Sequence, residues 1–488
     1  REEFPSDALT DMEAGSTSGA GYTNGAGSSE YKMLSYFARV NYTLMDRYLF
    51  EVNMRADASS RFHKDHRWGY FPSFSAGWRM SEESFMKDIE WINNLKIRAS
   101  YGTLGNINNV GNYDYFQNYS SGNHYNFSDS PVIGIGESKP ANETLGWEKV
   151  ALTDIGLDFD IFNGLLGVTA DYYIKNTSDI LLGYNVPTET GITAAPSQNI
   201  GKVKNTGFEL ALNHRNKIGA VNYSIGANIA TNKNKITNLG GSDNIIQTSS
   251  YIVKYILKKG ESIGSFYGFK TDGLYTQADI DAGHYYTLSG VVPNAGDIKF
   301  VPQRDIEYKQ EITDEDRTIL GKDVPDFTYG VNLSLQYKGF EFSMFGQGIS
   351  GTKVAFDVYG VHPFYHGQDS PRKYHLKRWT EENPNPHAAY PRIYSASSVH
   401  TTYNRNFSDY HLFDSDYFRF KTLSLGYTVP SATVKNWGLQ SLKVYVTGEN
   451  LFTVRADKKM EDFDPETAGG VIYTLGTKSV AFGVNISF

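Results

Sequence analysis

Cysteine is absent from the 488 residues of this chain, and charged residues make up only 20% of it. Without a thiol, the chain has no disulfide framework, no cysteine-ligated zinc site and no cysteine nucleophile. Lys and Arg do not gather in runs and the formal net charge is -8, so the phosphate-neutralising surface of a nucleic-acid-binding protein is missing. No window approaches the ~18 consecutive apolar residues of a membrane-spanning helix. These absences exclude thiol chemistry, nucleic-acid binding and helical membrane spans.

Aromatic residues and glycine are abundant, with 35 Tyr, 29 Phe and 47 Gly. This mixture suits twisted sheets with aromatic girdles and tight turns better than it suits helical domains. A membrane-spanning β-strand needs only about 9 to 11 residues of alternating character, which leaves the average hydropathy of a chain polar. The mean hydropathy of -0.43 therefore remains compatible with a membrane β-barrel.

Apolar and polar residues alternate with a period of two from residue 34 to residue 55. Leu34, Tyr36 and Val40 share one parity, and mostly polar residues occupy the other. The alternation breaks at Met45-Asp46 and then restarts. This pattern predicts two antiparallel strands joined by a tight turn.

The same unit recurs along the whole chain. It predicts about fifteen strands, near residues 31, 47, 70, 94, 147, 164, 205, 220, 250, 262, 327, 340, 417, 441 and 478. Short turns, such as Lys217-Ile218-Gly219 and Lys338-Gly339, alternate with long loops. We assign the long loops to residues 105–146, 177–204, 273–326 and 351–416. The fold class is therefore predicted as all-β, a transmembrane antiparallel barrel.

A soluble multidomain β-sandwich is the alternative, because its exposed strands also alternate. Two features favour the barrel. Short turns and long loops are expected at the periplasmic and extracellular ends of a membrane barrel. The parity predicted to face outward is apolar, with Tyr or Phe near strand ends, whereas a sandwich exposes its polar parity.

The number of strands and the end of the chain predict a partial barrel. An open sheet would leave two unpaired edges in hydrocarbon, and single-chain bacterial barrels have even strand numbers, so about fifteen strands imply others upstream. Phe488 is the last residue of the apolar set in the final predicted strand, and the final strand of an outer-membrane barrel typically ends in this way. If Phe488 is periplasmic, the Gly/Ser-rich residues 1–30 form an extracellular loop and residues 31–488 form the carboxy-terminal part of the barrel.

A series of specific motifs follows the strand pattern in a fixed order. They are Arg55-x-Asp57-x-Ser59-Ser60-Arg61-Phe62, Arg67-Trp68-Gly69-x-Phe71-Pro72-Ser73, Gly77-Trp78, Leu95-Lys96-Ile97-Arg98-Ala99-Ser100-Tyr101-Gly102, Gly105-Asn106, Gly156-Leu157-Asp158, Asp171-Tyr172-Tyr173, Lys175-x-Thr177-x-Asp179, Asn199-Ile200-Gly201, Asn205-x-Gly207-Phe208-Glu209, Gly264-Ser265-Phe266-Tyr267-Gly268 and Gly448-Glu449-Asn450-Leu451-Phe452. From about residue 31 to residue 488, the chain resembles the barrel of the SusC-like TonB-dependent transporters.

The resemblance implies a 22-stranded barrel in the outer membrane of a Gram-negative type of bacterium, surrounded by outer-membrane lipids. It further implies an amino-terminal plug in the barrel lumen, a SusD-like surface lipoprotein as a lid, and energy from TonB-ExbB-ExbD through the plug segment. Neither the plug nor a TonB-contacting segment is expected in these residues. On this count about fifteen of the 22 strands are present.

The chain departs from the family pattern after Gly296-Asp297-Ile298-Lys299. Many relatives continue with an Asp-x-Asn-x-Asp-Gly loop that resembles a calcium site, because alternating carboxylate and amide oxygens suit a hard cation. Here the sequence reads Val301-Pro302-Gln303-Arg304-Asp305. Oxygens from Asp314, Glu315 and Asp316 remain, but a solvated acidic turn is the simpler interpretation. We expect no cofactor or metal.

Catalytic signatures are absent from the sequence. His362-x-x-x-His366 has zinc-like spacing but lacks the Glu of a metalloprotease helix and lies in a Pro/Gly/Tyr-rich loop. There is no Gly-x-Ser-x-Gly elbow and no phosphate-binding loop. We therefore predict that the protein is not an enzyme.

Binding residues are predicted in two long loops, where aromatic rings alternate with Asn, Asp and His. Such pairs of apolar walls and placed polar groups suit sugars, although single aromatics can instead pack a loop or contact the lipoprotein. The candidates are Asn109, Tyr113, Asp114, Tyr115, Phe116, Tyr119, Tyr359, His362, Phe364, Tyr365 and Trp379.

The resulting functional hypothesis is TonB-dependent import of an oligosaccharide together with a SusD-like lipoprotein. An oligopeptide importer of the same family is the first alternative, because peptides also use aromatic and Asn contacts. A passive structural or adhesive surface barrel is the second alternative.

Overall fold

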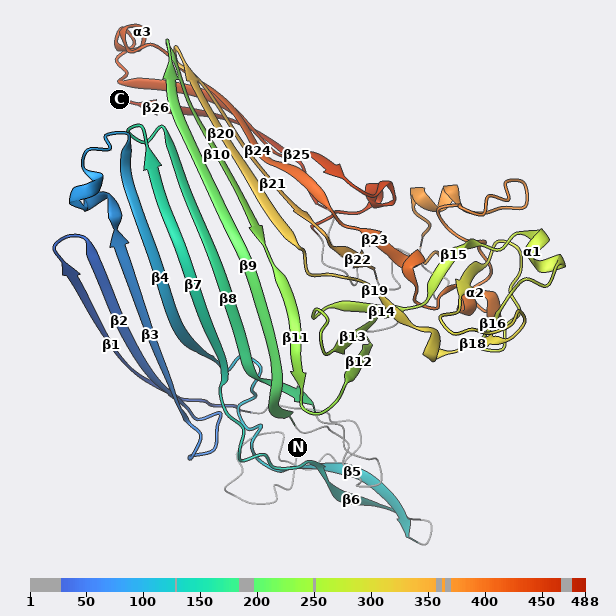
Figure 1. Ribbon diagram of the computed structural model, residues 1–488. Coiled ribbons are helices and arrows are strands. Elements are labelled where there is room, and N and C mark those ends of the chain that lie inside the picture. The colour runs from blue at the N-terminus through green and yellow to red at the C-terminus, as the bar shows by residue number, and fades with distance from the viewer. Residues whose placement is uncertain are drawn as a thin grey trace.

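A single curved antiparallel sheet, called the wall below, dominates the computed structural model, which describes residues 28–127, 130–183, 197–248, 252–356, 362–364, 370–466 and 476–488 (Figure 1). It has 14 strands. Its hydrogen-bonded path runs β1 (Met33–Leu44), β2 (Tyr48–Ser59), β3 (Trp68–Arg79), β4 (Ile92–Asn106), β7 (Glu148–Ile161), β8 (Leu166–Gly183), β9 (Ser197–Ile218), β10 (Val221–Thr231), β20 (Phe327–Tyr337), β21 (Phe340–Ser350), β24 (Tyr417–Thr428), β25 (Ser441–Arg455) and β26 (Ser479–Ser487). The remaining strand, β11 (Lys233–Leu239), pairs with β9. The all-β antiparallel prediction is confirmed.

Tight turns connect consecutive strands at one end of the wall. In the first hairpin, Leu44 pairs with Tyr48, and Met45 and Asp46 between them have φ of 53° and 54°. In another, Lys338 and Gly339 have φ of 44° and 86°. Two successive residues with positive φ match the right-handed twist of the flanking strands, which is why short hairpins use them. The predicted short turns are confirmed at both positions.

The two faces of the wall differ in chemistry. One parity exposes large apolar side chains to the surroundings: Tyr36 is 62% exposed, Ile155 56% and Phe482 83%. Water would make such a surface costly, at about 25 cal/mol for each Å² of apolar area, whereas lipid makes it favourable. The apolar parity is therefore the outward face, as the sequence predicts.

The opposite, inner parity carries ion pairs between neighbouring strands. On β4, Arg98 contacts Asp158 of β7 at 2.8 Å and Asp171 of β8 at 2.8 Å. A glycine makes room for this cluster, because a Cβ added at Gly156 would lie 2.2 Å from an Asp171 oxygen and 2.6 Å from Arg98 Cζ. The inner face is thus a polar surface with fixed, paired charges.

Two of the fifteen predicted strands do not belong to the wall, and this corrects the strand count. The segments near residues 250 and 262 form β13 (Lys254–Lys258) and β14 (Ser265–Gly268), which lie in a separate sheet with β12 (Asn244–Thr248) and β19 (Thr318–Lys322). Ile256 and Phe266 alternate like wall residues, yet they are buried against other protein segments. Alternation alone does not distinguish lipid from a protein core.

The long loops are folded rather than irregular. They contain three two-stranded pairs near the wall, β15 (Lys270–Leu274) with β17 (Ile298–Val301), β16 (Thr287–Leu288) with β18 (Glu311–Ile312), and β22 (Lys353–Ala355) with β23 (Leu412–Asp414). A further hairpin, β5 (Asn118–Phe127) with β6 (Ser130–Lys139), extends away from the wall (Figure 1).

Short helices complete the structure. The α-helices are α1 (Gln277–Asp281), α2 (Val399–Asn404) and α3 (Ser431–Lys435), and the 3-10 helices are η2 (Met80–Glu82), η3 (Ser84–Met86), η5 (Asp314–Asp316), η7 (Lys373–Lys377), η8 (Asp409–His411) and η9 (Lys458–Asp462). No helix in the described ranges has the length and apolar character needed to cross a membrane.

Small hydrophobic cores hold the long loops together. In the largest, Phe300 is fully buried and its ring meets Phe269 and Tyr403 edge-on at 5.7 and 5.2 Å between centroids. Tyr403 lies more than 100 positions after Phe269 and Phe300, so distant loops form one packed unit. We call the residues of this cluster the loop core. It lies beyond the ends of the wall strands, on the side opposite the tight turns (Figure 1).

The wall has two outermost strands in its path, β1 and β26, each paired on one side only within the described residues. The chain ends beside α3, at the end of the wall with the tight turns (Figure 1). Closure into a 22-stranded barrel stays a prediction. Most of the predicted loop 1–30 lies outside the described residues.

Replacing Phe300 with Ala is expected to destabilise the loop core by about 3–5 kcal/mol, because the surrounding rings cannot collapse fully into the space. Hydrogen exchange of residues 298–301 would measure the lost protection. The matched control is Leu376→Ala, since Leu376 is 76% exposed and its loss should cost below about 0.5 kcal/mol. Equal effects of the two substitutions would contradict a packed loop core.

Acid is expected to loosen the segment around His411. Burial lowers the pKa of His411 from 6.5 to about 4, although its ring accepts from or donates to Ser408 Oγ at 3.0 Å and donates to the Asn404 carbonyl at 3.0 Å. As pH falls below 6.5, His411 becomes protonated in the unfolded segment, whereas in the folded segment it stays neutral until about pH 4. The free energy of unfolding therefore falls through this window.

Between pH 6.5 and about pH 5, the loss should be about 1.5 kcal/mol for this histidine. It is measured as hydrogen-exchange protection of residues 403–413, corrected for the intrinsic pH dependence of exchange. His411→Gln should flatten the dependence. A wild-type segment with constant protection across this range would contradict the prediction.

Candidate functional site

The first predicted set of binding residues lies between β4 and the β5–β6 hairpin. Tyr113, Phe116 and Tyr119 are 47%, 50% and 64% exposed, while Tyr115 stacks on Phe116 with 4.2 Å between ring centroids. The Tyr113 hydroxyl accepts from the backbone N–H of Glu30 at 3.2 Å. Three of these four rings therefore present a surface to solvent at the long-loop end.

Two polar members of this set already have partners within the protein. The Asn109 side chain donates to Glu148 at 3.2 Å, and Glu148 is buried. Asp114 accepts from the backbone N–H of Gly111 at 2.5 Å and pairs with Lys139 at 2.9 Å. Both residues hold the loop in shape, which positions the exposed rings beside them.

The second predicted set divides into buried and exposed members. His362 is 2% exposed and its Nδ1 lies 3.2 Å from the Tyr390 hydroxyl. Burial lowers its pKa well below the usual value, so the ring is neutral. Trp379 is 5% exposed within the loop core, with the Arg392 guanidinium over its ring. Phe364 is 44% exposed.

Tyr359 and Tyr365, the other members of this set, lie outside the described residues. His362 and Trp379 are buried, which agrees with the alternative that single aromatic residues pack the loops. Phe364 is exposed and remains available to a ligand. Whether any of these residues binds substrate stays a prediction.

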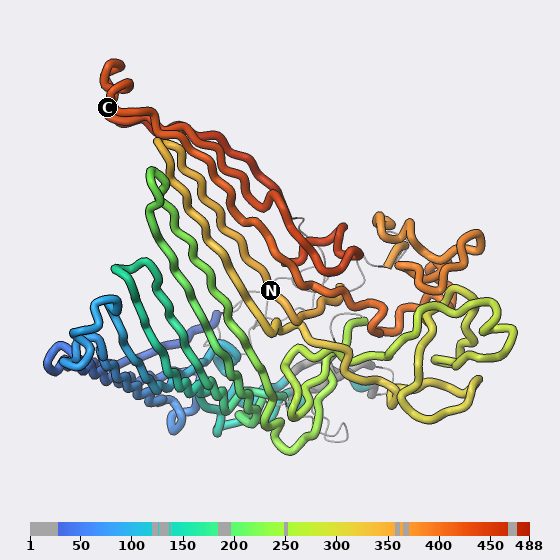
Figure 2. The backbone as a smooth tube through the Cα atoms, turned by 45° about the horizontal axis from the view of Figure 1, so that its top comes forward, coloured from blue at the N-terminus to red at the C-terminus, as the bar shows by residue number. Residues whose placement is uncertain are grey.

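The structure does not bring the two sets into one pocket. The β5–β6 hairpin and the region of α2 and β15 stand at separate places of the long-loop end in Figure 1, and the tube view of Figure 2 agrees. The described members of the two sets therefore lie in separate parts of the long-loop end.

The sequence analysis did not predict a charged cluster at the start of β24. Arg419, only 4% exposed, pairs with Asp464 at 2.7 Å and with Glu466 at 2.8 Å. Glu466 also accepts from the Tyr417 hydroxyl at 3.0 Å and pairs with Lys421 at 2.6 Å. A cavity of about 440 Å³ lies beside Tyr417 and Glu466 and extends to Phe266. The sequence did contain an indication of this cluster. Arg419 lies between Phe418 and Phe420, and the local alternation of apolar and polar residues predicts that it faces inward.

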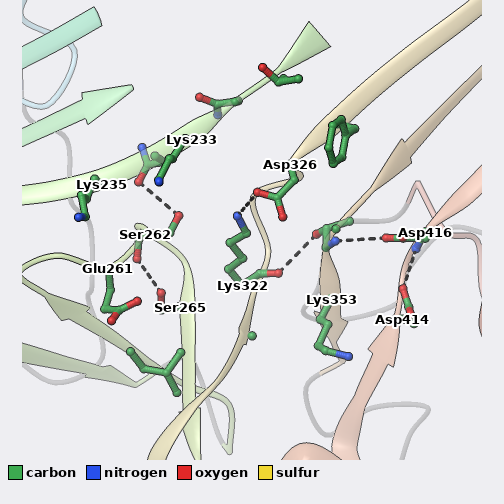
Figure 3. Close-up of a pocket in the computed structure, with 18 of the residues that line it drawn as sticks. Lys233, Lys235, Glu261, Ser262, Ser265, Lys322, Asp326, Lys353, Asp414 and Asp416 are labelled. Carbon is green, nitrogen blue, oxygen red and sulfur yellow. Dashed lines mark hydrogen bonds and ion pairs between the residues drawn. The ribbon is translucent and has the colours of Figure 1, made fainter. Parts of the chain in front are cut away.

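A larger cavity of about 690 Å³ opens where β10 and β20 stop pairing, at Thr231 and Phe327 (Figure 3). Beyond this pair the strands diverge, and β11, the turn at 260–262, β19 and β22 line the space. Lys322 pairs with Asp326 inside it. Lysines and carboxylates both line the space, so charged groups of each sign are available to a ligand there.

The acidic turn after β18 holds a guanidinium group. Arg304 contacts Asp316 through both Nε, at 3.1 Å, and Nη2, at 2.7 Å, and it contacts Glu315 at 3.0 Å. Burial would raise the pKa of Asp316, but the bonds from Arg304 and from backbone N–H groups outweigh it and hold the pKa at about 2. Asp314 pairs with Arg317 at 2.6 Å.

A metal therefore does not fit this turn as it is built, because the oxygens that remain are committed to arginines. In the ranges that the structure describes, no group of three or more His, Asp or Glu side chains is arranged to hold a metal ion. The prediction of no metal stays a prediction.

Residues 4–451 match the family model described as TonB dependent receptor-like, beta-barrel. Among curated proteins, the chain is 32% identical over 431 residues to TonB-dependent receptor P3 of Formosa agariphila, a match that covers 87% of this chain and 41% of that protein. It is 29% identical over 467 residues to TonB-dependent receptor SusC of Bacteroides thetaiotaomicron, covering 93% of this chain and 43% of SusC. The chain thus spans less than half the length of these relatives.

Among solved structures, the RagAB peptide transporter superposes with a TM-score of 0.77 at 25% identity. The superposition covers 99% of this chain and 50% of that one. The fold therefore agrees across nearly the whole chain. This protein belongs to the TonB-dependent receptor β-barrel family and is of the SusC-like type.

Proposed function

We propose that the wall of this protein belongs to a TonB-dependent outer-membrane importer of a bulky polar nutrient. The observation that carries the proposal is the two-faced wall, which has an apolar outward face, an inner face of paired charges such as Arg98–Asp158, and its longest folded loops at one end. A polar lumen lets a hydrophilic solute pass while the outward face satisfies lipid.

An oligosaccharide is the leading substrate class. Sugars offer apolar C–H faces ringed by hydroxyl groups, so their sites combine exposed aromatic rings with amide and carboxylate groups. Tyr113, Phe116 and Phe364 supply exposed rings at the long-loop end. Asn109 and Asp114 stand beside the first two.

An oligopeptide is the second candidate, and a specific observation favours it. The solved relative with a TM-score of 0.77 is described as a peptide transporter. The cavity in Figure 3 is also lined by both lysines and carboxylates, which suits a ligand with both charges. A passive structural or adhesive barrel is the third candidate, and a surface that binds no soluble nutrient would favour it.

The proposal includes two partners. A SusD-like lipoprotein would close over the loops, and TonB-ExbB-ExbD would supply energy through a plug segment. Support comes from the match to SusC and from the superposition on RagAB. We further propose that the protein catalyses no reaction, because the buried His362 is held by Tyr390 in a packed environment. His366, the other residue of the zinc-like spacing, lies outside the described residues.

Calorimetric titration of the full-length transporter, purified with any lipoprotein that accompanies it, tests the proposal against matched panels of oligosaccharides and oligopeptides. Saturable binding to one glycan class is the expected result. Binding to peptides alone would replace the leading substrate class by the second. Binding to neither panel, in a preparation that retains its lipoprotein, would contradict nutrient import.

Replacing Tyr113 or Phe364 with Ala is expected to weaken binding of that substrate about fivefold to tenfold, because each variant removes an exposed aromatic platform. The matched control is Tyr308→Ala, since Tyr308 is 51% exposed but belongs to neither predicted set. Unchanged affinity in both loop variants would remove these residues from the binding site. Loss of affinity in the control as well would indicate a general effect on the loops.

The acidic turn is expected to be independent of calcium, because Arg304 supplies the positive charge internally. Hydrogen-exchange protection of residues 301–317 should be the same in EDTA and in about 5 mM Ca²⁺, a concentration above the range in which extracellular modules bind. Arg304→Asn should reduce that protection by about 3 kcal/mol, since it leaves Asp316 buried without its partner. Lower wild-type protection in EDTA would contradict this prediction.

A further inference from the structure

Four lysines project from the outward face of β9 and β11, just beyond the apolar part of the wall. They are Lys202 and Lys204 on β9 and Lys233 and Lys235 on β11, and all are exposed. We call them the lysine patch. Their parity follows from the register, because Lys233 pairs with Thr206 and Lys235 with Lys204, two and four residues from the outward Phe208.

Two members of the patch oppose each other directly. Lys204 and Lys235 are cross-strand partners, which places their Cβ atoms about 4.5–5.5 Å apart. Like charges in this position destabilise a sheet. Lys233 lies about 7 Å from this pair toward Phe208, and Lys202 lies about 7 Å from it in the opposite direction, so the patch is about 13 Å long. It therefore presents four positive charges in a row along the two strands.

The protein supplies no counter-charge at this place. None of the four lysines forms an ion pair with another residue in the described part of the chain. The acids that line the neighbouring cavity are otherwise engaged: Asp326 pairs with Lys322, and Asp416 accepts from Ser350 and from the backbone of Thr352. Asp414 accepts from the backbone N–H of Asp416 at 3.2 Å, and Glu261 is the remaining acid of the cavity lining, so the patch stays positive.

The height of the patch relative to lipid is set by the strands that carry it. Outward Tyr172, Phe208 and Phe327 mark the aromatic end of the apolar face on β8, β9 and β20. At about 3.3 Å per residue and a tilt of about 40°, Lys233 lies about 5 Å above that level, Lys204 and Lys235 about 10 Å, and Lys202 about 15 Å. Head groups add about 5–8 Å to each side of the hydrocarbon, and lysine side chains bend toward them, so the patch stands at the outer margin of the head-group layer.

The patch lies at the long-loop end, which is the extracellular end of such a wall, so the lipid beside it belongs to the outer leaflet. Beside Lys233 and Lys235, the cavity of Figure 3 leaves room for a group larger than water. We propose that Lys202, Lys204, Lys233 and Lys235 bind the phosphate groups of an outer-leaflet lipid head group. The proposal rests on the membrane position of the wall and is independent of the transported substrate.

Native mass spectrometry of the full-length transporter in detergent tests the proposal, with diphosphoryl lipid A as the probe. The expected result is saturable binding that weakens at least about tenfold when all four lysines become Gln, because each basic residue near an anionic surface contributes about 1 kcal/mol. The same four positions changed to Arg should retain binding, which shows that charge rather than folding is responsible. Lipid A without phosphates should bind as weakly as the Gln variant.

A charge-matched control replaces four other exposed lysines, Lys258, Lys259, Lys270 and Lys377, with Gln. It should leave lipid A binding within about twofold of the wild type, because these residues lie on or beside β13, β15 and η7, away from the strands of the wall. Equal losses in both Gln variants would overturn the proposal, since net charge alone would then explain them.

Two further outcomes would also overturn it. Inorganic phosphate that displaces lipid A at equal concentration would make the ligand a free anion instead of a lipid. Unchanged lipid A binding in the patch variant, together with loss of the accompanying lipoprotein, would assign the patch to a protein partner. Substrate titration of the patch variant is measured in parallel, so that a failure of import and a failure of lipid binding are distinguished.

Discussion

The backbone hydrogen bond between neighbouring strands is the constraint on which this structure depends. Hydrocarbon offers no water to an N–H or C=O group, so every residue of the wall has to be satisfied by the next strand. The ladder from β2 to β25 meets this requirement on both edges of each strand. Because pairing fixes the register, it also fixes which side chains face lipid and which face inward. The apolar outward parity and the inner ion pairs of Arg98 are consequences of that single condition.

Much of the wall could be predicted from sequence because each residue in it obeys a period of two. Tyr36 and Val40 face outward as alternation requires, and Met45-Asp46 forms the tight turn. The failure at Ile256 and Phe266 has a physical cause: a strand packed on a protein core and a strand packed on lipid bury the same kind of side chain on one face. Only the contacts decide between them, and those come from residues such as Phe407, about 140 positions away in the chain.

The candidate site was less predictable because loop aromatics serve two purposes. Composition selected Trp379 and Phe364 alike, but the fold buries the first beneath Arg392 and exposes the second. Long-range packing makes that choice, and no local pattern encodes it. Arg304 is a different case. The loss of the oxygen-rich motif was visible in the sequence, whereas the guanidinium that takes up Asp316 and Glu315 could be found only in three dimensions.

The pairing of Thr231 with Phe327 has a consequence for how such proteins diversify. After β11, which still pairs with β9, the chain leaves the wall and returns to it at Phe327, so residues 240–326 form a closed excursion. The same holds between Ile349 and Tyr417. Insertions, deletions or exchanges within either excursion leave the ladder untouched, since its flanking residues keep their partners. The paired strands of the wall can therefore stay constant while the segments at its long-loop end change independently under selection.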